Sequence, residues 1–196
     1  MSFGFPTCNV DGYSELEKAL KTAYAKDVLL FAAASNNGGQ LGRSFPAREP
    51  TVISVHSTDA NGNRSKFSPT PHRDGTNLAT IGEAVESAWP VQLCDEDSNP
   101  ECVRTKSGTS FATPILVGIA AFLLMYARAN LPDKASAMKS QKRMEAVLKR
   151  VAEKGSGSAH QLRDGYHFVD VSLHTDSLFG RDKEFIDATL RDLLSH

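Results

Sequence analysis

The chain has 196 residues and carries 22 Lys and Arg against 23 Asp and Glu, so its formal net charge is only -1. This length suits one domain with a sizeable hydrophobic core. The balanced charge excludes the strongly basic surface that attracts nucleic acids or anionic membranes, so we expect neither as a partner. Three cysteines without metal-ligand spacing give no reason to expect a metal or another cofactor. Cys94 and Cys102 could bridge an acidic loop, but reduced thiols are the favoured interpretation.

The first six residues, Met-Ser-Phe-Gly-Phe-Pro, do not form a targeting signal. They contain neither the basic region nor the continuous apolar run of a secretory signal peptide. We therefore expect an intracellular, cytoplasmic protein, or a chain whose amino-terminal part is missing.

The first predicted elements are a helix and a buried strand. Residues 14–17, Ser-Glu-Leu-Glu, have the form of a capping box, and apolar side chains follow at helical spacing, which predicts a helix over residues 14–26. Residues 28–34 are a continuous apolar run, which is typical of a strand buried on both faces in a parallel sheet covered by helices. A turn cluster follows at residues 35–39, at the edge of the sheet where ligand sites gather.

The middle of the chain predicts one more strand and a loop. Residues 51–55 are β-branched and apolar, which is typical of a strand. Residues 83–101 are acidic and irregular, with two prolines. A solvated loop is the favoured interpretation there, because the spacing of the acids does not indicate a cation site.

Residues 107–114, Ser-Gly-Thr-Ser-Phe-Ala-Thr-Pro, lead directly into an apolar helix. Ser110 should lie in its first turn, near unpaired N–H groups and the positive end of the helix dipole, where developing negative charge is best tolerated. A simple helix cap is the alternative. No residue from Ser110 to Ala127 is charged, so a membrane span is a third interpretation. Pro114, Gly118 and the polar entry favour a buried core helix in an α/β protein.

Three motifs resemble those of the subtilisin-like serine proteases. Gly-Thr-Ser-Phe-Ala-Thr-Pro is similar to the family's nucleophile motif, which implies that Ser110 is the nucleophile. Residues 32–38, Ala-Ala-Ala-Ser-Asn-Asn-Gly, resemble the strand and loop whose Asn binds the oxyanion, which implies this role for Asn36, with Ser35 where the family has Gly. Without the resemblance, these residues predict a plain turn. Residues 45–48, Phe-Pro-Ala-Arg, are similar to the stretch that lines the S1 pocket after a cis aromatic–Pro bond.

The resemblance implies a fold and a substrate-binding region. The fold is three-layer α/β with a mostly parallel sheet of subtilisin-like type, present as a partial domain in residues 1–132. An α-rich extension over residues 133–196 resembles that of fungal intracellular subtilases. Residues 1–4, Met-Ser-Phe-Gly, resemble the family's substrate-lining Met-Ser-Leu-Gly. The substrate-binding residues implied in this way are Ser2, Phe3, Gly4, Ala32, Ala33, Ala34, Ser35 and Pro46.

The Asp and His motifs of the family's catalytic triad are absent from the sequence. None of the six histidines stands in the family's His-Gly-Thr context, and a general base must reach the serine. We therefore expect the carboxyl half of a serine endopeptidase domain, inactive alone, with the other half supplied in cis or in trans and a peptide or protein as substrate. The alternative is a catalytically dead interaction module with the same fold.

The extension predicts three elements. Residues 134–154 form a basic amphipathic helix that should pack on the domain, although calmodulin targets and membrane-surface helices have a similar pattern. Residues 155–158 predict a Gly-Ser linker, residues 166–171 a strand and residues 183–194 a last amphipathic helix.

Overall fold

The computed structural model describes residues 1–7, 11–39, 41–73, 75–94, 99–153 and 164–195. A four-stranded parallel sheet has the order β1-β2-β3-β6, and a two-stranded antiparallel hairpin pairs β4 with β5. The strands are β1 (Phe31–Ala33), β2 (Ile53–Thr58), β3 (Leu78–Ile81), β4 (Val85–Ala88), β5 (Val103–Lys106) and β6 (His167–Phe168). The α-helices are α1 (Tyr13–Tyr24), α2 (Thr109–Asn130), α3 (Gln141–Ala152) and α4 (Lys183–Ser195), and the 3-10 helices are η1 (Val91–Leu93), η2 (Ala137–Lys139) and η3 (Leu178–Gly180).

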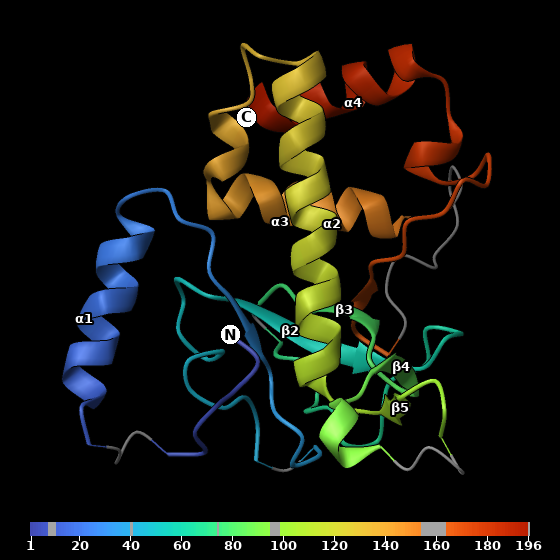
Figure 1. The fold of residues 1–196 in the computed structure, drawn as a ribbon. Coiled ribbons are helices and arrows are strands. Elements are labelled where there is room, and N and C mark those ends of the chain that lie inside the picture. Colours follow the sequence, from blue (N-terminus) through green and yellow to red (C-terminus); the bar gives the residue numbers. More distant parts are fainter. Residues whose placement is uncertain (8–10, 40, 74, 95–98, 154–163, 196) are drawn as a thin grey trace.

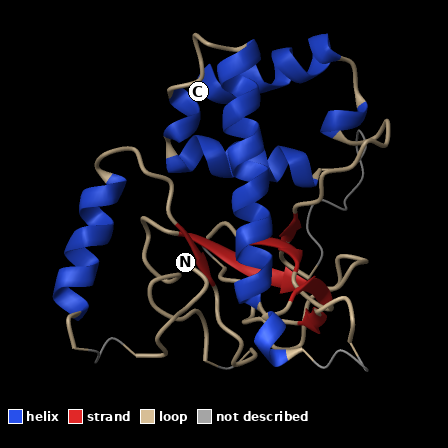
Figure 2. Cartoon of the chain, in the orientation of Figure 1, coloured by secondary structure: helices blue, strands red, loops and turns tan. Residues whose placement is uncertain are grey.

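Helices on both sides of the main sheet make the predicted three-layer α/β arrangement (Figures 1 and 2). On one side, Ile53 and Val55 of β2 belong to the same apolar core as Leu116 of α2. On the other side, Leu20 of α1 packs in a smaller core with Ala32 of β1. The α/β fold with a mostly parallel sheet is therefore confirmed.

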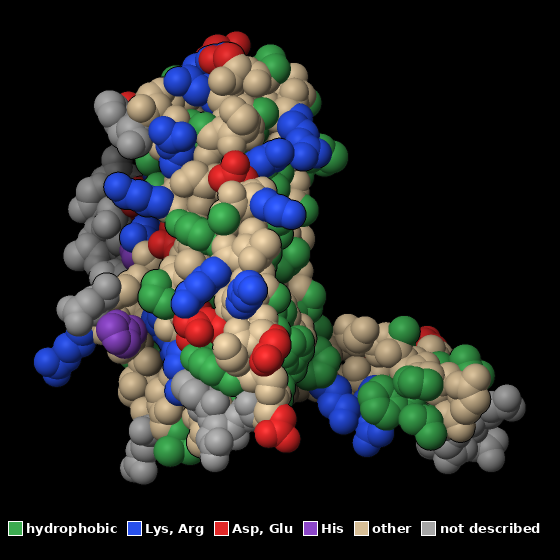
Figure 3. All heavy atoms as spheres, turned by 90° about the vertical axis from the view of Figure 1, so that its left-hand side faces the viewer, with side chains coloured by type: hydrophobic (Ala, Val, Ile, Leu, Met, Phe, Trp, Pro, Cys, Tyr) green, Lys and Arg blue, Asp and Glu red, His purple; other side chains and the backbone are tan. Residues whose placement is uncertain are grey.

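Helix α2 crosses the sheet as its central helix (Figure 1). Among the described residues it is the one helix long and apolar enough to cross a membrane, but it packs on β1, β2 and β3. One side of α2 is buried in the core, whereas its other side exposes Val117, Phe122 and Met125. Figure 3 shows hydrophobic side chains along the right-hand edge of the upright body of the molecule. Part of the central helix therefore has no covering layer within the described chain.

Three local predictions were wrong. Helix α1 begins at Tyr13, after Gly12, and no side chain caps it, so Ser14 lies inside the helix and the capping box does not form. The acidic stretch over residues 83–101 is not irregular throughout, because it contains β4, which pairs with β5 directly after the stretch. Cys94 and Cys102 form a disulfide bond with their Cα atoms 5.5 Å apart, which corrects the expected reduced thiols. The cytoplasmic location stays a prediction.

The extension after residue 132 shares its core with the sheet. Met144 and Leu148 of α3 and Leu190 of α4 lie in the same hydrophobic cluster as Leu116. Strand β6 adds to the edge of β3, as part of the segment 166–171 that the sequence predicts to be extended. The predicted division into two domains stays a prediction, and the predicted Gly-Ser linker at residues 155–158 lies outside the described residues.

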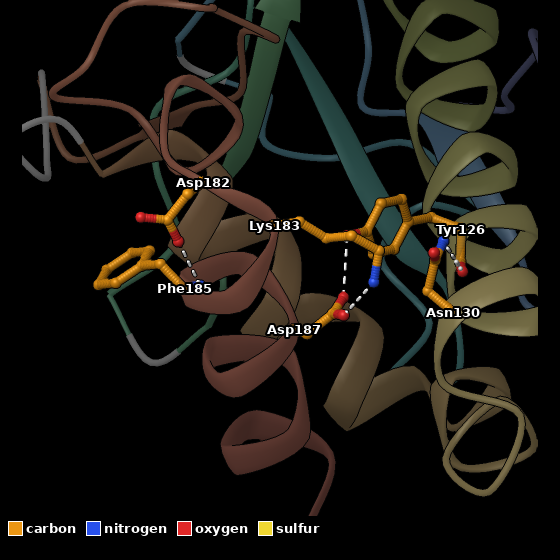
Figure 4. Close-up of polar contacts among 6 residues, drawn as sticks. All are labelled: Tyr126, Asn130, Asp182, Lys183, Phe185 and Asp187. Atoms are coloured by element: carbon orange, nitrogen blue, oxygen red, sulfur yellow. Dashed lines mark hydrogen bonds and ion pairs between the residues drawn. The ribbon is translucent and has the colours of Figure 1, made fainter.

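Helix α4 is joined to α2 by a polar contact (Figure 4). The Tyr126 hydroxyl donates to Asp187 Oδ1 at 2.9 Å, and Lys183 also contacts the Asp187 carboxylate. Burial, and then the hydrogen bond to Asp187, raise the pKa of Tyr126 to about 12. The phenol therefore stays a hydrogen-bond donor at neutral pH.

Candidate active site

A pocket of about 210 Å³ lies where the carboxyl end of β1 meets the first turn of α2. Its lining residues are Ser2, Phe3, Gly4, Pro6, Ala33, Ser35, Asn36, Asn37, Ser44, Thr109 and Ser110. The pocket thus brings together segments that are more than 70 residues apart in the sequence. None of these lining residues is charged or is a histidine.

The side chain of Asn36 is fixed by Thr109. Asn36 Oδ1 accepts the Thr109 N–H at 2.8 Å and the Thr109 hydroxyl at 2.9 Å, and this hydroxyl also lies 3.2 Å from the Ser35 carbonyl oxygen. With the oxygen held in this way, the amide nitrogen of Asn36 lies on the side of Gly108. The carboxamide is oriented before any ligand arrives, as an oxyanion donor requires.

Ser110 and Asn36 flank the same small space. A Cβ atom added to Gly108 would lie 3.1 Å from Asn36 Nδ2 and 3.2 Å from Ser110 Oγ. Glycine at residue 108 therefore keeps open the space between a hydroxyl and an amide donor. An oxygen placed there would lie within reach of both groups.

Ser110 is the second residue of α2, in the first turn. The Thr109 N–H is taken by Asn36, and the N–H groups of Phe111 and Ala112 are directed to the Gly108 carbonyl. Within the described chain, the Ser110 N–H is the first-turn amide for which no partner is found. It can add a second donor, aided by the helix dipole.

Glycine at residue 82 allows β3 to approach the start of α2. Its carbonyl oxygen accepts the Gly108 N–H at 2.8 Å. A Cβ atom at residue 82 would lie 2.5 Å from Ser57 Oγ and 2.9 Å from the Gly108 carbonyl oxygen. The contact between Gly82 and Gly108 therefore positions the first turn of α2, with Ser110, relative to the end of β3.

Most of the predicted substrate-binding residues line the pocket. Ser2, Phe3, Gly4, Ala33 and Ser35 do so, together with Ser110 and Asn36. Ser35 does not require a positive φ, and its hydroxyl accepts the Asn37 N–H at 3.2 Å, so serine is compatible with the backbone at this position.

Three of the predicted substrate-binding residues do not reach the pocket. Ala32 and Ala34 are fully buried, and the backbone of Ala34 is bonded to Val55 and Ser44. Pro46 is buried and follows the cis Phe45–Pro46 bond that the resemblance implies, but it is not among the lining residues. The predicted role of these three residues in binding substrate stays a prediction.

Sequence reasoning missed four lining residues, namely Pro6, Asn37, Ser44 and Thr109. Thr109 was present in the nucleophile motif, and a second hydroxyl beside Asn36 was a signal for its anchoring role. Ser44 carried no such signal. It reaches the pocket because Phe5 and Phe45 exchange two backbone hydrogen bonds of 2.7 and 2.9 Å, which draw residues 2–5 against residues 44–45.

No described histidine can serve Ser110 as a base. His56 is fully buried, and burial, followed by the charges of Arg43 and Arg64, lowers its pKa to about 3. Its Nδ1 atom lies 3.3 Å from Ser68 Oγ. His72, His167 and His174 do not line the pocket, and the other two histidines lie outside the described residues.

The sequence matches the family described as "Subtilase family" over residues 1–166. The chain belongs to the subtilase family. Among curated proteins, this subtilase chain is 31% identical over 147 residues to Thermitase of Thermoactinomyces vulgaris, covering 75% of this chain and 44% of that protein. It is 32% identical over 124 residues to M-protease of Shouchella clausii (strain KSM-K16), covering 63% of this chain and 28% of that protein.

Solved subtilase structures agree with the fold. The Patellamide maturation protease PatA matches with a TM-score of 0.62 and 27% identity, covering 98% of this chain and 62% of that chain. The Prenylagaramide maturation protease PagA matches with a TM-score of 0.62 and 27% identity, covering 87% of this chain and 58% of that chain. This subtilase chain thus spans less than half the length of these curated relatives and about 60% of these two solved chains.

Proposed function

We propose that this chain carries the nucleophile and the oxyanion site of a subtilisin-like serine endopeptidase. Ser110 Oγ attacks a peptide carbonyl carbon, and the oxyanion is held by Asn36 Nδ2 and the Ser110 N–H. The observation that carries the proposal is the placement of Ser110 Oγ and Asn36 Nδ2 around one space above Gly108. The family membership supports a peptide or protein substrate.

The general base comes, in this proposal, from a segment outside the chain. A serine hydroxyl is a weak nucleophile without a base, and the described pocket lining holds no acid or histidine. We therefore propose that the chain is the carboxyl half of the catalytic domain, of the fungal intracellular type. The missing half supplies Asp and His in cis or in trans. The chain alone is inactive.

The uncovered side of α2 is where the complementing half would pack. Exposed Val117 of α2 and Phe31 of β1 line an apolar groove of about 430 Å³. Next to it, the Met1 amino group donates to the Phe31 carbonyl oxygen at 2.6 Å, and the Met1 carbonyl oxygen accepts the Ala33 N–H at 3.0 Å, as in a parallel strand pair. A further sheet and helix layer placed there would bury the exposed apolar side of α2.

The neutral pocket suggests a substrate preference. All of its described lining side chains are uncharged, and its volume is small. A charged substrate side chain would lose hydration there without a partner. We therefore expect cleavage after small or medium uncharged residues, measured as kcat/KM on peptides that differ at that one position.

Fluorophosphonate labelling, read by mass spectrometry, tests the proposal. The 196-residue chain should label weakly, whereas the native polypeptide, if it carries the missing motifs, should label at Ser110, and Ser110→Ala should abolish this. Strong labelling of the chain alone would contradict its dependence on another half. A complete protein that is active but unlabelled at Ser110 would contradict the nucleophile assignment.

Asn36→Ala tests the oxyanion donor in the complete enzyme. Loss of one such donor in subtilisin lowers kcat by about 10²–10³, and we expect the same range here. Asn37→Ala, a neighbouring change in the same pocket, is the matched control and should leave kcat within about tenfold of the unmodified enzyme. Equal losses would show that the loop, and not the Asn36 amide, carries the effect.

The alternative is a catalytically dead interaction module. The absence of an acid or a base among the described pocket residues favours it as much as it favours a missing half. The intact mass and sequence of the native polypeptide separate the two: an additional segment with both missing motifs supports the protease. Subcellular fractionation tests the intracellular location, which secretion of the protein would contradict.

A further inference from the structure

A second cavity lies on the other side of the sheet from α2, around Ser54 of β2. Its volume is about 510 Å³, within the usual range of about 300–1,000 Å³ for small-molecule sites. It shares no lining residue with the Ser110 pocket. Its lining residues are Arg43, Arg48, Glu49, Pro50, Val52, Ser54, His72, Gly75, Thr76, Gln141 and Glu145.

Three polar atoms of this lining are buried and lack a hydrogen-bond partner within the part of the chain that the structure describes. They are Arg43 Nε, Ser54 Oγ and Gln141 Oε1. Ser54 is only 3% exposed, so bulk water does not reach its hydroxyl freely. Buried polar groups are normally paired, and three unpaired ones around one cavity indicate an occupant with complementary groups.

The Arg43 side of the cavity is fixed and donates hydrogen bonds. Arg43 Nη2 donates to Asn77 Oδ1 at 2.6 Å, and Asn77 in turn holds the backbone of His72 and Gly75. Burial lowers the pKa of Arg43 from its ordinary value, which reflects the removal of its charge from water. A fixed guanidinium with an unpaired Nε–H and the unpaired Ser54 hydroxyl, both from residues that line the cavity, are suited to a carboxylate.

The lining residues that come from α3 accept hydrogen bonds. Gln141 Nε2 donates to the Pro50 carbonyl and to Glu145 Oε1, each at 3.0 Å, so Gln141 Oε1 remains as an acceptor on the same helix as the Glu145 carboxyl group. These two groups are suited to an ammonium group or another N–H donor.

The other charged lining residues are engaged elsewhere. Arg48 donates to the carbonyl oxygens of Phe5 and Pro6 at 3.1 Å. Glu49 accepts the Tyr13 hydroxyl at 3.4 Å. The unpaired donors and the unpaired acceptor are therefore the groups that distinguish this cavity.

We propose that this cavity binds a small zwitterion, a free amino acid or a dipeptide. The carboxylate lies against Arg43 and Ser54, and the ammonium group lies against Gln141 and Glu145. This site is separate from the Ser110 pocket, so it does not depend on the proposed protease activity.

Calorimetric titration of the 196-residue chain with glycylglycine tests the proposal, with acetate and methylammonium as probes of each half. We expect saturable binding of glycylglycine and weaker binding of either half-probe. Ser54→Ala should weaken glycylglycine about tenfold or more, because a hydrogen bond to a charged group is lost. Gln141→Leu should weaken glycylglycine and methylammonium but not acetate.

Thr58→Val is the matched control. Thr58 lies on the same strand and also has a buried hydroxyl without a partner, but it does not line the cavity, so binding should be unchanged. Melting temperatures of all variants confirm that each is folded. The proposal would be overturned if glycylglycine did not saturate the chain even well above about 1 mM, or if acetate bound as tightly as glycylglycine. It would also be overturned if Ser54→Ala and Gln141→Leu both left glycylglycine binding unchanged.

Discussion

Strand β2 is buried on both faces, but the two faces are held by different forces. Ile53 and Val55 point into the apolar core that holds α2. The alternate residues Ser54 and His56 are also buried, yet their neighbours are polar and charged. The apolar face holds the helix that positions Ser110, and the polar face contains the second cavity. Burial alone therefore does not tell how a residue in this sheet contributes to stability.

The largest effect on the free energy of unfolding is expected from truncating a side chain of the apolar core next to β2. Leu116→Ala removes a fully buried side chain of α2 and should lower the free energy of unfolding by about 2–5 kcal/mol. Val117→Ala, at the next residue of α2, removes a side chain that is 38% exposed and should lower it by less than about 1 kcal/mol. Urea titrations measure both. Similar losses of unfolding free energy in the two variants would mean that the exposed side of α2 is covered in solution. The two sides of α2 would then not differ in how much they stabilise the chain.

The polar face should make stability depend on pH. Because the pKa of His56 is about 3 in the folded chain and its ordinary value is 6.5, the unfolded chain binds more protons between these pH values. Stability is therefore complete above pH 6.5 and is lost as the pH falls. From pH 6.5 to 4.5 the loss should be about 2–3 kcal/mol. Burial also lowers the pKa of His167, which acts in the same direction.

Urea titrations at several pH values check this slope. His56→Gln should remove most of it, whereas His174→Gln, at an exposed residue, should leave it unchanged. An unchanged slope in His56→Gln would show that the polar face does not hold a neutral histidine.

The smallest expected effect concerns an unpaired hydroxyl on β2. Thr58 Oγ1 is buried and has no partner within the described residues. Thr58→Val keeps the shape but removes the desolvated hydroxyl, so we expect a gain in stability of about 1 kcal/mol. A loss of similar size, measured by thermal or urea unfolding, would reveal a partner such as bound water.

The sequence was most informative where the signal was local. The change from a polar loop to an apolar run predicted that Ser110 lies in the first turn of a helix, and α2 begins at Thr109. The apolar run before Asn36 predicted a buried parallel strand, although β1 is shorter than residues 28–34 because Val28 is 48% exposed. The Asn36 interpretation needed the family resemblance, since its residues alone indicate a turn.

Local patterns failed where partners distant in the sequence decided the outcome. The backbone of Ala34 pairs with Val55 and Ser44, two partners that the local pattern around residue 34 does not reveal. The acidic stretch after β3 did not show an alternation that would predict β4 and β5, because these strands are mostly exposed and depend on pairing with each other.

By itself, the sequence determined that a buried strand precedes Asn36 and that a helix begins next to Ser110, because periodicity and turn chemistry act over a few residues. The tertiary structure alone decided that Asn36 faces Ser110 and that Arg43, Ser54 and Gln141 surround one cavity. Such groups meet only when strands and helices distant in the chain pack against one another, and no local pattern encodes that packing.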